Sequence, residues 1–192
     1  MTIYTIGHST RSLADFVGLL ERSRIERLID VRAFPGSRRH PHFNREALAR
    51  TLPEEGIEYL HRAALGGRRR SRPDAPPSAW RNESFRAYAD YMRTAEFRRA
   101  IEELIARGAE RRTVIMCSEA VPWRCHRMLI SDALHARGVT VEHILDAGVS
   151  PHVLTSFAVV VDGEITYPAT EEANESAEQH VLSLDDSSPL TP

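Results

Sequence analysis

The chain has 192 residues, of which 42% are hydrophobic and 27% charged, a composition typical of a globular protein of about one domain. Its two cysteines exclude the disulfide scaffold of small secreted proteins, and its longest apolar runs are about five residues, far short of the ~20 that a transmembrane helix needs. No basic segment followed by an apolar stretch opens the sequence, so we expect a cytoplasmic protein without a membrane partner.

All 25 basic residues are arginine, and they are unevenly distributed. Residues 1–112 hold 22 arginines against 15 acidic residues, whereas residues 113–192 hold 3 arginines against 12. A GC-rich genome explains the preference for arginine over lysine, but it does not explain the position of the charge. A basic first part suits an anionic partner, so we expect a small anionic substrate or a nucleic acid.

Strand patterns alternate with helical patterns along the chain. Runs of β-branched and aromatic residues predict strands at residues 2–6, 28–31, 57–61, 113–117 and 139–145. Apolar residues at helical spacing predict helices at about residues 13–20, 44–52, 84–91, 94–107 and 122–137. Ser12 and Asn44 are expected to cap the first two helices. Gly108 and Gly138 are expected to end the last two.

The order of these elements predicts the fold class. Strands separated by helices indicate an α/β fold, with a mainly parallel sheet of about five strands and helices on both faces. Residues 158–167 add a C-terminal β-hairpin, with Asp162-Gly163 as its two-residue turn. We expect residues 1–168 to form a single α/β domain. Residues 169–192 are rich in Glu, Asp and Ser and lack arginine, which predicts an acidic disordered tail.

Reactive side chains follow the ends of the predicted strands. The polar residues at these ends are His8, Ser9, Asp30, Arg32, His61, Cys117, Glu119 and Asp146. In an open parallel sheet all the carboxyl ends lie at one edge, and ligands bind outside that edge. We therefore expect these side chains to converge on one site. The sequence motifs of dinucleotide sites, P-loops and serine-hydrolase elbows are absent from the sequence.

The densest group of reactive residues is C-S-E-A-V-P-W-R-C-H-R, residues 117–127. Cys125 and His126 fall near the first turn of a helix, whose positive end, together with Arg124 and Arg127, favours a thiolate. Cys117 is alternatively a small core residue at a strand end, and a reversible Cys117–Cys125 disulfide is a further interpretation. The catalytic candidates are His8, Cys117, Glu119, Cys125 and His126. A cysteine would be the nucleophile, and His8 or Glu119 would move a proton.

Zinc is the metal that these residue types would suit, through His8, Cys117, Cys125 and His126. The spacing argues against it, because the sequence has no C-x-x-C or H-x-x-x-H pair. Adjacent Cys125 and His126 would also project about 100° apart on a helix. We therefore predict no metal site, and the residues point to no particular cofactor.

A second set of residues is expected to bind the substrate. Its members are Ser9, Asp30, Arg32, Ser37, Arg38, His61, Gly66, Gly67 and Arg127. Asp30 and Arg32 share one face of a strand, so a structural ion pair that holds the following loop is a competing interpretation. The four arginines of residues 68–72 have no acid nearby and suit phosphates, although solvated surface arginines would also fit.

Several motifs together resemble one family. They include T-I-G-H-S (5–9), D-V-R-A-F-P-G-S-R-R (30–39), G-I-E-Y-L-H (56–61), L-G-G-R (65–68) and the segment 117–127. Over about residues 3–146 the sequence resembles the bacterial and archaeal domain-of-unknown-function 488 family. The resemblance implies an α/β domain with a shared polar site, but it supplies no reaction. The site that it implies contains His8, Asp30, Arg32, Cys117, Glu119, Cys125, His126 and Arg127.

Two functions follow from these observations. The first is an enzyme whose pocket at the strand edge acts on an anionic, phosphate-bearing substrate, by transfer or hydrolysis on a nucleotide or nucleic acid. The second is a non-catalytic module that binds nucleic acid or another partner through its arginine-rich loops. The second function predicts an affinity that falls steeply with salt and cysteines that are structural.

Overall fold

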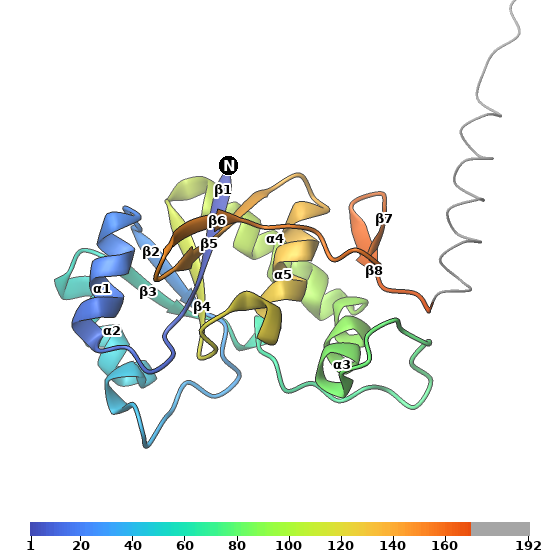
Figure 1. Cartoon of the computed structure of the whole chain (residues 1–192), viewed down its shortest axis with the longest axis horizontal. Helices are drawn as coiled ribbons and strands as arrows, with labels where there is room; N and C mark the ends of the chain where they lie inside the picture. The colour runs from blue at the N-terminus through green and yellow to red at the C-terminus, as the bar shows by residue number, and fades with distance from the viewer. Residues whose placement is uncertain (170–192) are drawn as a thin grey trace, which may run out of the picture.

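A computed structural model describes residues 1–169 of the chain (Figure 1). The strands are β1 (Thr2–Gly7), β2 (Arg27–Asp30), β3 (Glu58–His61), β4 (Thr113–Cys117), β5 (Thr140–Leu145), β6 (Gly148–Pro151), β7 (Val159–Val161) and β8 (Glu164–Thr166). The α-helices are α1 (Leu13–Arg22), α2 (Arg45–Glu54), α3 (Glu83–Met92), α4 (Ala95–Glu110) and α5 (Arg127–His135). Three short 3-10 turns lie at Pro41–Phe43, Ala63–Leu65 and Pro122–Arg124.

The central sheet has six strands in the order β3-β2-β4-β1-β5-β6. The first five are parallel, and β6 is antiparallel to β5. The predicted mainly parallel α/β architecture is therefore confirmed, as is the separate C-terminal hairpin of β7 and β8. The edge strand β6 is an addition that the sequence did not indicate. Its segment G-V-S-P is exposed or half-buried along its length and lacks the alternating pattern of a half-buried strand.

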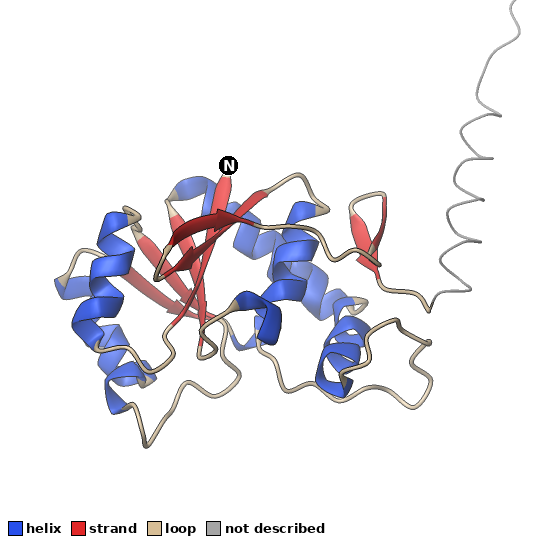
Figure 2. Cartoon of the chain, in the orientation of Figure 1, coloured by secondary structure: helices blue, strands red, loops and turns tan. Residues whose placement is uncertain are grey.

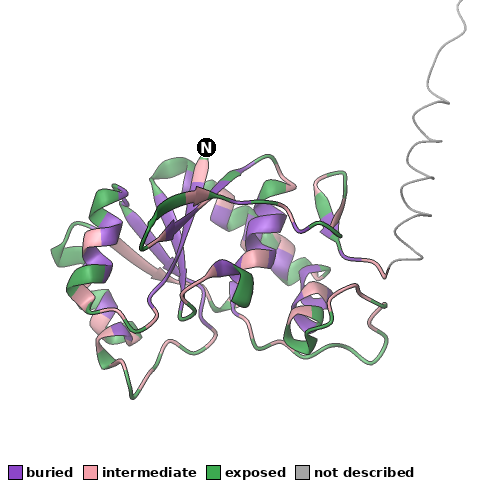
Figure 3. Ribbon diagram, viewed as in Figure 1, coloured by how far each residue is buried: buried purple, intermediate pink, exposed green. Residues whose placement is uncertain are grey.

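Helices cover both faces of the sheet (Figure 2). Because side chains alternate along a strand, neighbouring residues of β1 and β4 enter different cores. Ile3 and Ile115 pack with α3, α4 and α5, whereas Tyr4 and Val114 pack with α1 and α2. The strands β1, β2 and β4 are buried along nearly their whole length between these layers (Figure 3).

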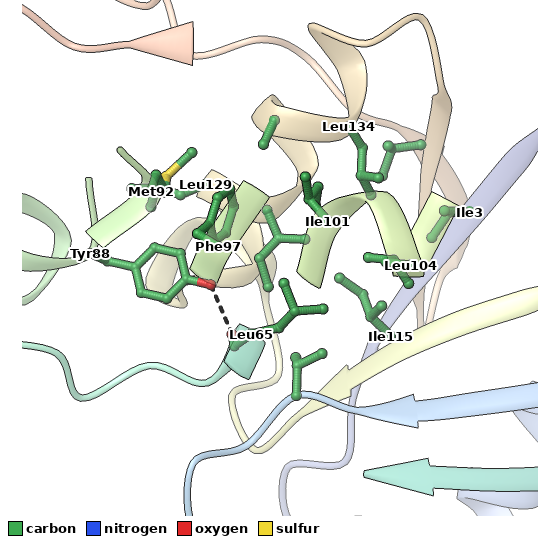
Figure 4. Packing of buried hydrophobic residues seen from close by; sticks show 14 of the residues in the cluster. Ile3, Leu65, Tyr88, Met92, Phe97, Ile101, Leu104, Ile115, Leu129 and Leu134 are labelled. Atoms are coloured by element: carbon green, nitrogen blue, oxygen red, sulfur yellow. Dashed lines mark hydrogen bonds between the residues drawn. The ribbon is translucent and has the colours of Figure 1, made fainter. Parts of the chain in front are cut away.

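The larger core lies under α3, α4 and α5 (Figure 4). Ile101 of α4 and Leu129 of α5 are fully buried in it, and each contributes about 1.5–3 kcal/mol by leaving water. Tyr88 of α3 joins this core and donates a hydrogen bond of 2.8 Å from its hydroxyl to the carbonyl of Leu65. The core therefore fixes α3 against the loop that follows β3.

Two of the predicted helix signals are wrong. Gly108 lies inside α4 rather than at its end, because the absence of a side chain lets the helix approach Ile3: a Cβ there would lie 2.8 Å from that side chain. Asn44 stands at the N-cap of α2 but does not cap it, since its Oδ1 accepts from the backbone N–H of Ser37 instead. Ser12 does cap α1, by accepting from the N–H of Asp15 at 3.1 Å.

The C-terminal hairpin turns at Asp162 and Gly163, which both have positive φ, as a two-residue turn with right-handed strand twist requires. The predicted disordered tail lies outside the described residues from position 170 onward. Within residues 1–169, no helix has the length and apolar character needed to cross a bilayer.

The strand connections switch from one face of the sheet to the other around β4. β1 and β2 both lead into helices on one face, α1 and α2, whereas β4 lies between them and leads into α5 on the other face. The loops at the carboxyl end of β4 therefore diverge from those of its neighbours. Such a switch point leaves a crevice at the sheet edge, and this is where ligands bind in open α/β folds.

Candidate functional site

A cavity of about 730 Å³ opens at this edge of the sheet. The segments that follow β1, β2 and β4 form its floor and one wall, and Gly67, Arg68 and the start of α3 form the other wall. The backbone N–H of His8 donates to the carbonyl of Cys117 at 3.0 Å, which continues the β1–β4 pairing one residue into the site. The cavity thus forms where the parallel sheet ends and its loops separate.

One group of reactive side chains is a thiol–imidazole centre. Nδ1 of His126 lies 3.5 Å from Sγ of Cys125 and 3.9 Å from Sγ of Cys117, and all three atoms lie within 4.8 Å of one another. Nε2 of His126 is 3.1 Å from the carbonyl of Val31, which can only accept. Nε2 therefore carries the proton, and Nδ1 directs its lone pair at the two sulfur atoms.

The backbone around Cys125 explains how adjacent residues converge. The expectation that Cys125 and His126 occupy one helix and point apart is wrong. Cys125 is extended, with φ −141° and ψ 150°, after the 3-10 turn that Pro122 begins, and α5 starts only at Arg127. The change from extended to helical backbone between these residues turns both side chains toward Cys117.

The two thiols have opposite acidities. The neighbouring Cys125 thiol, then the His126 ring, which can take up the thiol proton at Nδ1, and the Arg127 guanidinium hold the pKa of Cys117 well below its usual range despite burial. Burial, followed by the nearby Cys117 sulfur, raises the pKa of Cys125. Since both thiols are buried, the centre favours one thiolate on Cys117 that accepts a hydrogen bond from Cys125.

Arg127 supplies a positive charge beneath this centre. Its side chain is 1% exposed, yet it forms no ion pair with a carboxylate among residues 1–169. It donates to the carbonyl of Glu119 and, at 3.5 Å, to the hydroxyl of Thr5, while its Nε has no partner there. A buried cation of this kind stabilises an anion nearby, and the Cys117 thiolate is available as that anion.

The second group surrounds Arg32. Its guanidinium donates to both carboxylate oxygens of Asp30, at 2.9 and 2.5 Å, and to the carbonyl of Phe43 at 2.8 Å. Because Asp30 is fully buried, this pair is the structural ion pair that the strand pattern allowed. Arg32 nevertheless also reaches the cavity wall.

His8 belongs to the Arg32 group. Its Nδ1–H donates to the carbonyl of Ser9 at 2.9 Å, and its Nε2 accepts from Arg32 at 3.2 Å. The ring stacks on Phe43 with centroids 4.3 Å apart. Burial and the adjacent Arg32 charge lower the pKa of His8 to about 4, so the ring is neutral near pH 7. Both ring nitrogens are thus occupied in this arrangement.

The arginines of the long loops divide into two kinds. Arg39, Arg68 and Arg124 are exposed and line the cavity. Arg69 donates to three backbone carbonyls and lies 3.7 Å from the ring centroid of Tyr91, and Arg72 forms an ion pair of 2.7 Å with Asp90. The expectation that no acid is near residues 68–72 is therefore wrong, because Asp74 lies two residues after Arg72 and the fold also brings Asp90 to Arg72 from a distant position in the sequence.

The cavity brings together nine of the fourteen residues singled out from the sequence. These are His8, Ser9, Arg32, Ser37, Gly67, Cys117, Glu119, Cys125 and His126. The five others, which do not line the cavity, are Asp30, Arg38, His61, Gly66 and Arg127. Each has a contact or position that explains this. Asp30 and Arg127 lie behind the wall, His61 approaches the carbonyl of Arg32 at 2.8 Å, Gly66 packs on Ala33, and Arg38 lies on the exposed surface.

Sequence reasoning missed several residues of the wall. The predicted site residues include Arg38 rather than Arg39, and they do not include Arg124, Phe34, His40 or Tyr88, all of which line the cavity. The adjacent arginines Arg38 and Arg39 have no periodic context that separates an inward from an outward side chain. The apolar face that contains Tyr88 predicted core, and the residue is in fact core and wall together.

The fold and the site define a class: an open α/β protein with a thiol–imidazole centre at the carboxyl edge of its parallel strands. The family model described as "Domain of unknown function DUF488" matches residues 12–134, which include β2 to β4 and the whole Cys117–Arg127 segment. The chain belongs to this family. No curated protein and no solved structure matches the chain.

Proposed function

We propose that the protein is an enzyme that binds a phosphate-bearing anion in the edge cavity and acts on it at the centre formed by Cys117, Cys125 and His126. One observation carries this proposal: the thiol–imidazole centre and three exposed arginines line the same cavity. Arginine binds phosphate through paired N–H groups, and these arginines line the cavity that also contains the Cys117 sulfur. A purely structural centre would not need to open into a basic cavity.

The roles divide by position. Arg39, Arg68 and Arg124 hold the anion at the mouth of the cavity. The Cys117 sulfur is the reactive group at the floor, and the lone pair of His126 Nδ1 accepts or returns a proton there. Glu119 is exposed at the rim and is the second proton carrier, whereas His8 first has to release Arg32 before it can take a proton. We further propose a nucleotide as the substrate, because a flat base could stack on the exposed ring of Phe34 beside Arg68.

Anion binding is tested by calorimetric titration with pyrophosphate and with adenosine 5′-monophosphate. Replacing Arg39 or Arg124 with alanine removes a charge-assisted contact of about 1.5–3 kcal/mol, so the affinity should fall about tenfold or more. Arg38→Ala is the matched control, since Arg38 is the sequence neighbour of Arg39 but does not line the cavity, and its affinity should stay within twofold. Equal losses in Arg38→Ala and Arg39→Ala would contradict the cavity as the binding site.

Catalysis is tested by incubating a metabolite extract with the wild-type protein and with Cys117→Ser. Phosphate-bearing compounds should be consumed only by the wild-type protein, as measured by mass spectrometry. The Ser variant should keep the affinity for pyrophosphate, because its arginines are intact. An identical metabolite profile for the two proteins would count against an enzyme.

The alternative, a non-catalytic nucleic-acid module, makes different predictions. It spreads binding over the basic surface, so Arg38→Ala and Arg70→Ala would weaken an oligonucleotide complex as much as Arg39→Ala does. Its affinity would also fall steeply with salt, in proportion to the number of phosphates contacted. Weak dependence on salt together with dependence on Arg39 and Arg124 supports the enzyme.

A further inference from the structure

We propose that Cys117, Cys125 and His126 bind a single Zn²⁺ ion, with the fourth coordination position open to the cavity. This inference rests on the proposed function, in which the same cavity binds the anion, and it changes one role: the ion, rather than the Cys117 sulfur, is then the group that meets the substrate. In this form the two thiolates and the imidazole are metal ligands, and the anionic substrate or a water molecule meets the ion from the cavity side.

The separations between the three ligand atoms fit a zinc site. Tetrahedral Zn²⁺ with Zn–S of about 2.3 Å and Zn–N of about 2.0–2.1 Å requires S···N separations of roughly 3.5 Å and an S···S separation of about 3.8 Å. Nδ1 of His126 lies 3.5 Å from Sγ of Cys125 and 3.9 Å from Sγ of Cys117. All three atoms lie within 4.8 Å of one another, so side-chain shifts of less than about 1 Å complete the geometry.

The imidazole is already in the tautomer that a metal needs. A ligating histidine normally donates its other N–H to a carbonyl or carboxylate, which fixes the ring and directs the free lone pair at the ion. Nε2 of His126 makes this contact with the carbonyl of Val31 at 3.1 Å. Gly67 lies close against the ring, and a Cβ there would approach Nδ1 to 2.9 Å. The ring is therefore held in place by Val31, the residue after β2, on one side and by Gly67 on the other.

The charge around the centre suits two thiolates. Thiolate ligands select zinc over the hard cations, and both must be deprotonated when the metal binds. Zn²⁺ with two thiolates and a neutral imidazole carries no net charge, and Arg127, buried behind the centre without a carboxylate partner among the described residues, offsets the negative charge that an anionic fourth ligand adds. The thiols themselves are 6% and 3% exposed, which separates the ligands from bulk water on all sides except the cavity.

Three protein ligands and an accessible fourth position are the pattern of catalytic rather than structural zinc sites. All three residues line the 730 Å³ cavity that Arg39, Arg68 and Arg124 also line. A bound Zn²⁺ supplies a Lewis acid for a phosphate oxygen or lowers the pKa of a bound water. The arginines and the ion would then act on the same anionic group.

The test uses the full reduced chain loaded with Co²⁺, a spectroscopic substitute for Zn²⁺, together with elemental analysis after equilibrium dialysis against Zn²⁺. We expect one equivalent of metal and a thiolate-to-cobalt charge-transfer band in the near ultraviolet, with intense visible bands of tetrahedral Co²⁺. Cys117→Ser, Cys125→Ser and His126→Ala should each weaken binding at least 100-fold. His40→Ala is the matched control, because His40 lines the same cavity away from the thiols and should leave the affinity within twofold.

Well under half an equivalent of metal, or Co²⁺ without a charge-transfer band, would overturn the site. The same conclusion follows if His40→Ala weakens binding as much as His126→Ala does. If the Cys117→Ser variant does not fold, the spectrum of the wild-type protein still decides, since the band intensity reports how many thiolates bind. Loss of metal binding with intact pyrophosphate binding removes this inference alone, whereas metal binding without any anion binding removes the proposed function alone.

Discussion

At the scale of single residues, a buried polar chain stands directly behind the site. Asp132 accepts from Nε2 of His152 at 2.9 Å, and Nδ1 of His152 then accepts from Nε2 of His143 at 3.1 Å. Nδ1 of His143 in turn accepts from the hydroxyl of Thr5 at 2.8 Å. Each imidazole has a single tautomer that satisfies both neighbours while it stays neutral. The chain ends at Thr5, which also contacts Arg127, so the support of the thiol–imidazole centre depends on these tautomers.

The hydrogen-bonded row of Asp132, His152, His143 and Thr5 predicts a loss of stability in mild acid. Burial, then the neighbouring His152 ring and the Arg127 guanidinium, lower the pKa of His143 to about 4 despite Asp132. Between the unfolded value near 6.5 and pH 4, the unfolded chain binds a proton that the folded chain refuses, so the free energy of unfolding falls as the pH decreases. The free energy of unfolding should fall by about 3 kcal/mol because of His143, and by a similar amount because of His8. Urea unfolding from pH 7.5 to 4 measures it.

The matched pair for this prediction is His143→Gln and His135→Gln. Glutamine at 143 keeps hydrogen-bonding groups but cannot titrate, so this variant should lose less stability between pH 7 and 4.5. His135 is exposed on α5 with its ring centroid 6.1 Å from that of His152, and its replacement should change the pH dependence less than His143→Gln does. Parallel curves for the two variants would show that His143 is not neutral in the folded protein.

At the scale of elements, the site depends on how closely β1 and β4 approach at their carboxyl ends. Gly7 is paired with Cys117, and the chain after Cys117 folds back over Gly7. A Cβ on Gly7 would lie only 1.7 Å from the carbonyl oxygen of Glu119, the same oxygen to which Arg127 donates. The glycine thus permits the turn that positions Cys117 and Glu119 on the cavity wall.

Replacing Gly7 with alanine should therefore displace the loop after β4. We expect a destabilisation of about 1–3 kcal/mol or more from overpacking, measured by urea unfolding, and weaker metal and pyrophosphate binding. Gly36→Ala is the control, because a Cβ there meets nothing within 4 Å, and its stability should change by about 0.5 kcal/mol or less. A Gly7→Ala protein as stable as wild type would refute the close approach.

At the scale of the whole molecule, two separate cores share one sheet. Leu20 of α1 lies in the core on one face, and Ile101 of α4 lies in the core on the other. Strands β1, β2 and β4 contribute alternate residues to both, so neither core is complete when the sheet is lost. This arrangement supports the prediction of a single domain over residues 1–168.

We accordingly predict one cooperative unfolding transition. Leu20→Ala and Ile101→Ala each remove a fully buried side chain and should lower the free energy of unfolding by about 2–5 kcal/mol. In both variants the far-ultraviolet circular dichroism and tryptophan fluorescence transitions should coincide, because both cores unfold with the sheet. Separated transitions in Leu20→Ala alone would indicate two units of independent stability.

Local patterns in the sequence determined the strands, the helices on both faces and the edge at which the reactive side chains emerge. A strand of period two and a helix of period 3.6 leave a signal within a few residues, as β4 and α1 do. Because parallel strands deliver their ends to one side, the pattern predicted Cys117 at this edge, and the dense segment 117–127 added Cys125 and His126 as candidates.

Contacts between distant residues were decided only by the tertiary structure. The extended backbone of Cys125 and the carbonyl of Val31 bring Cys117, Cys125 and His126 into the close arrangement that helical spacing argued against. Asp90 neutralises Arg72 from α3, and β6 pairs with β5 without a sequence pattern of its own. Such pairings depend on which surfaces the packed layers bring together. The free energy of these long-range contacts is not encoded in any short segment of the chain.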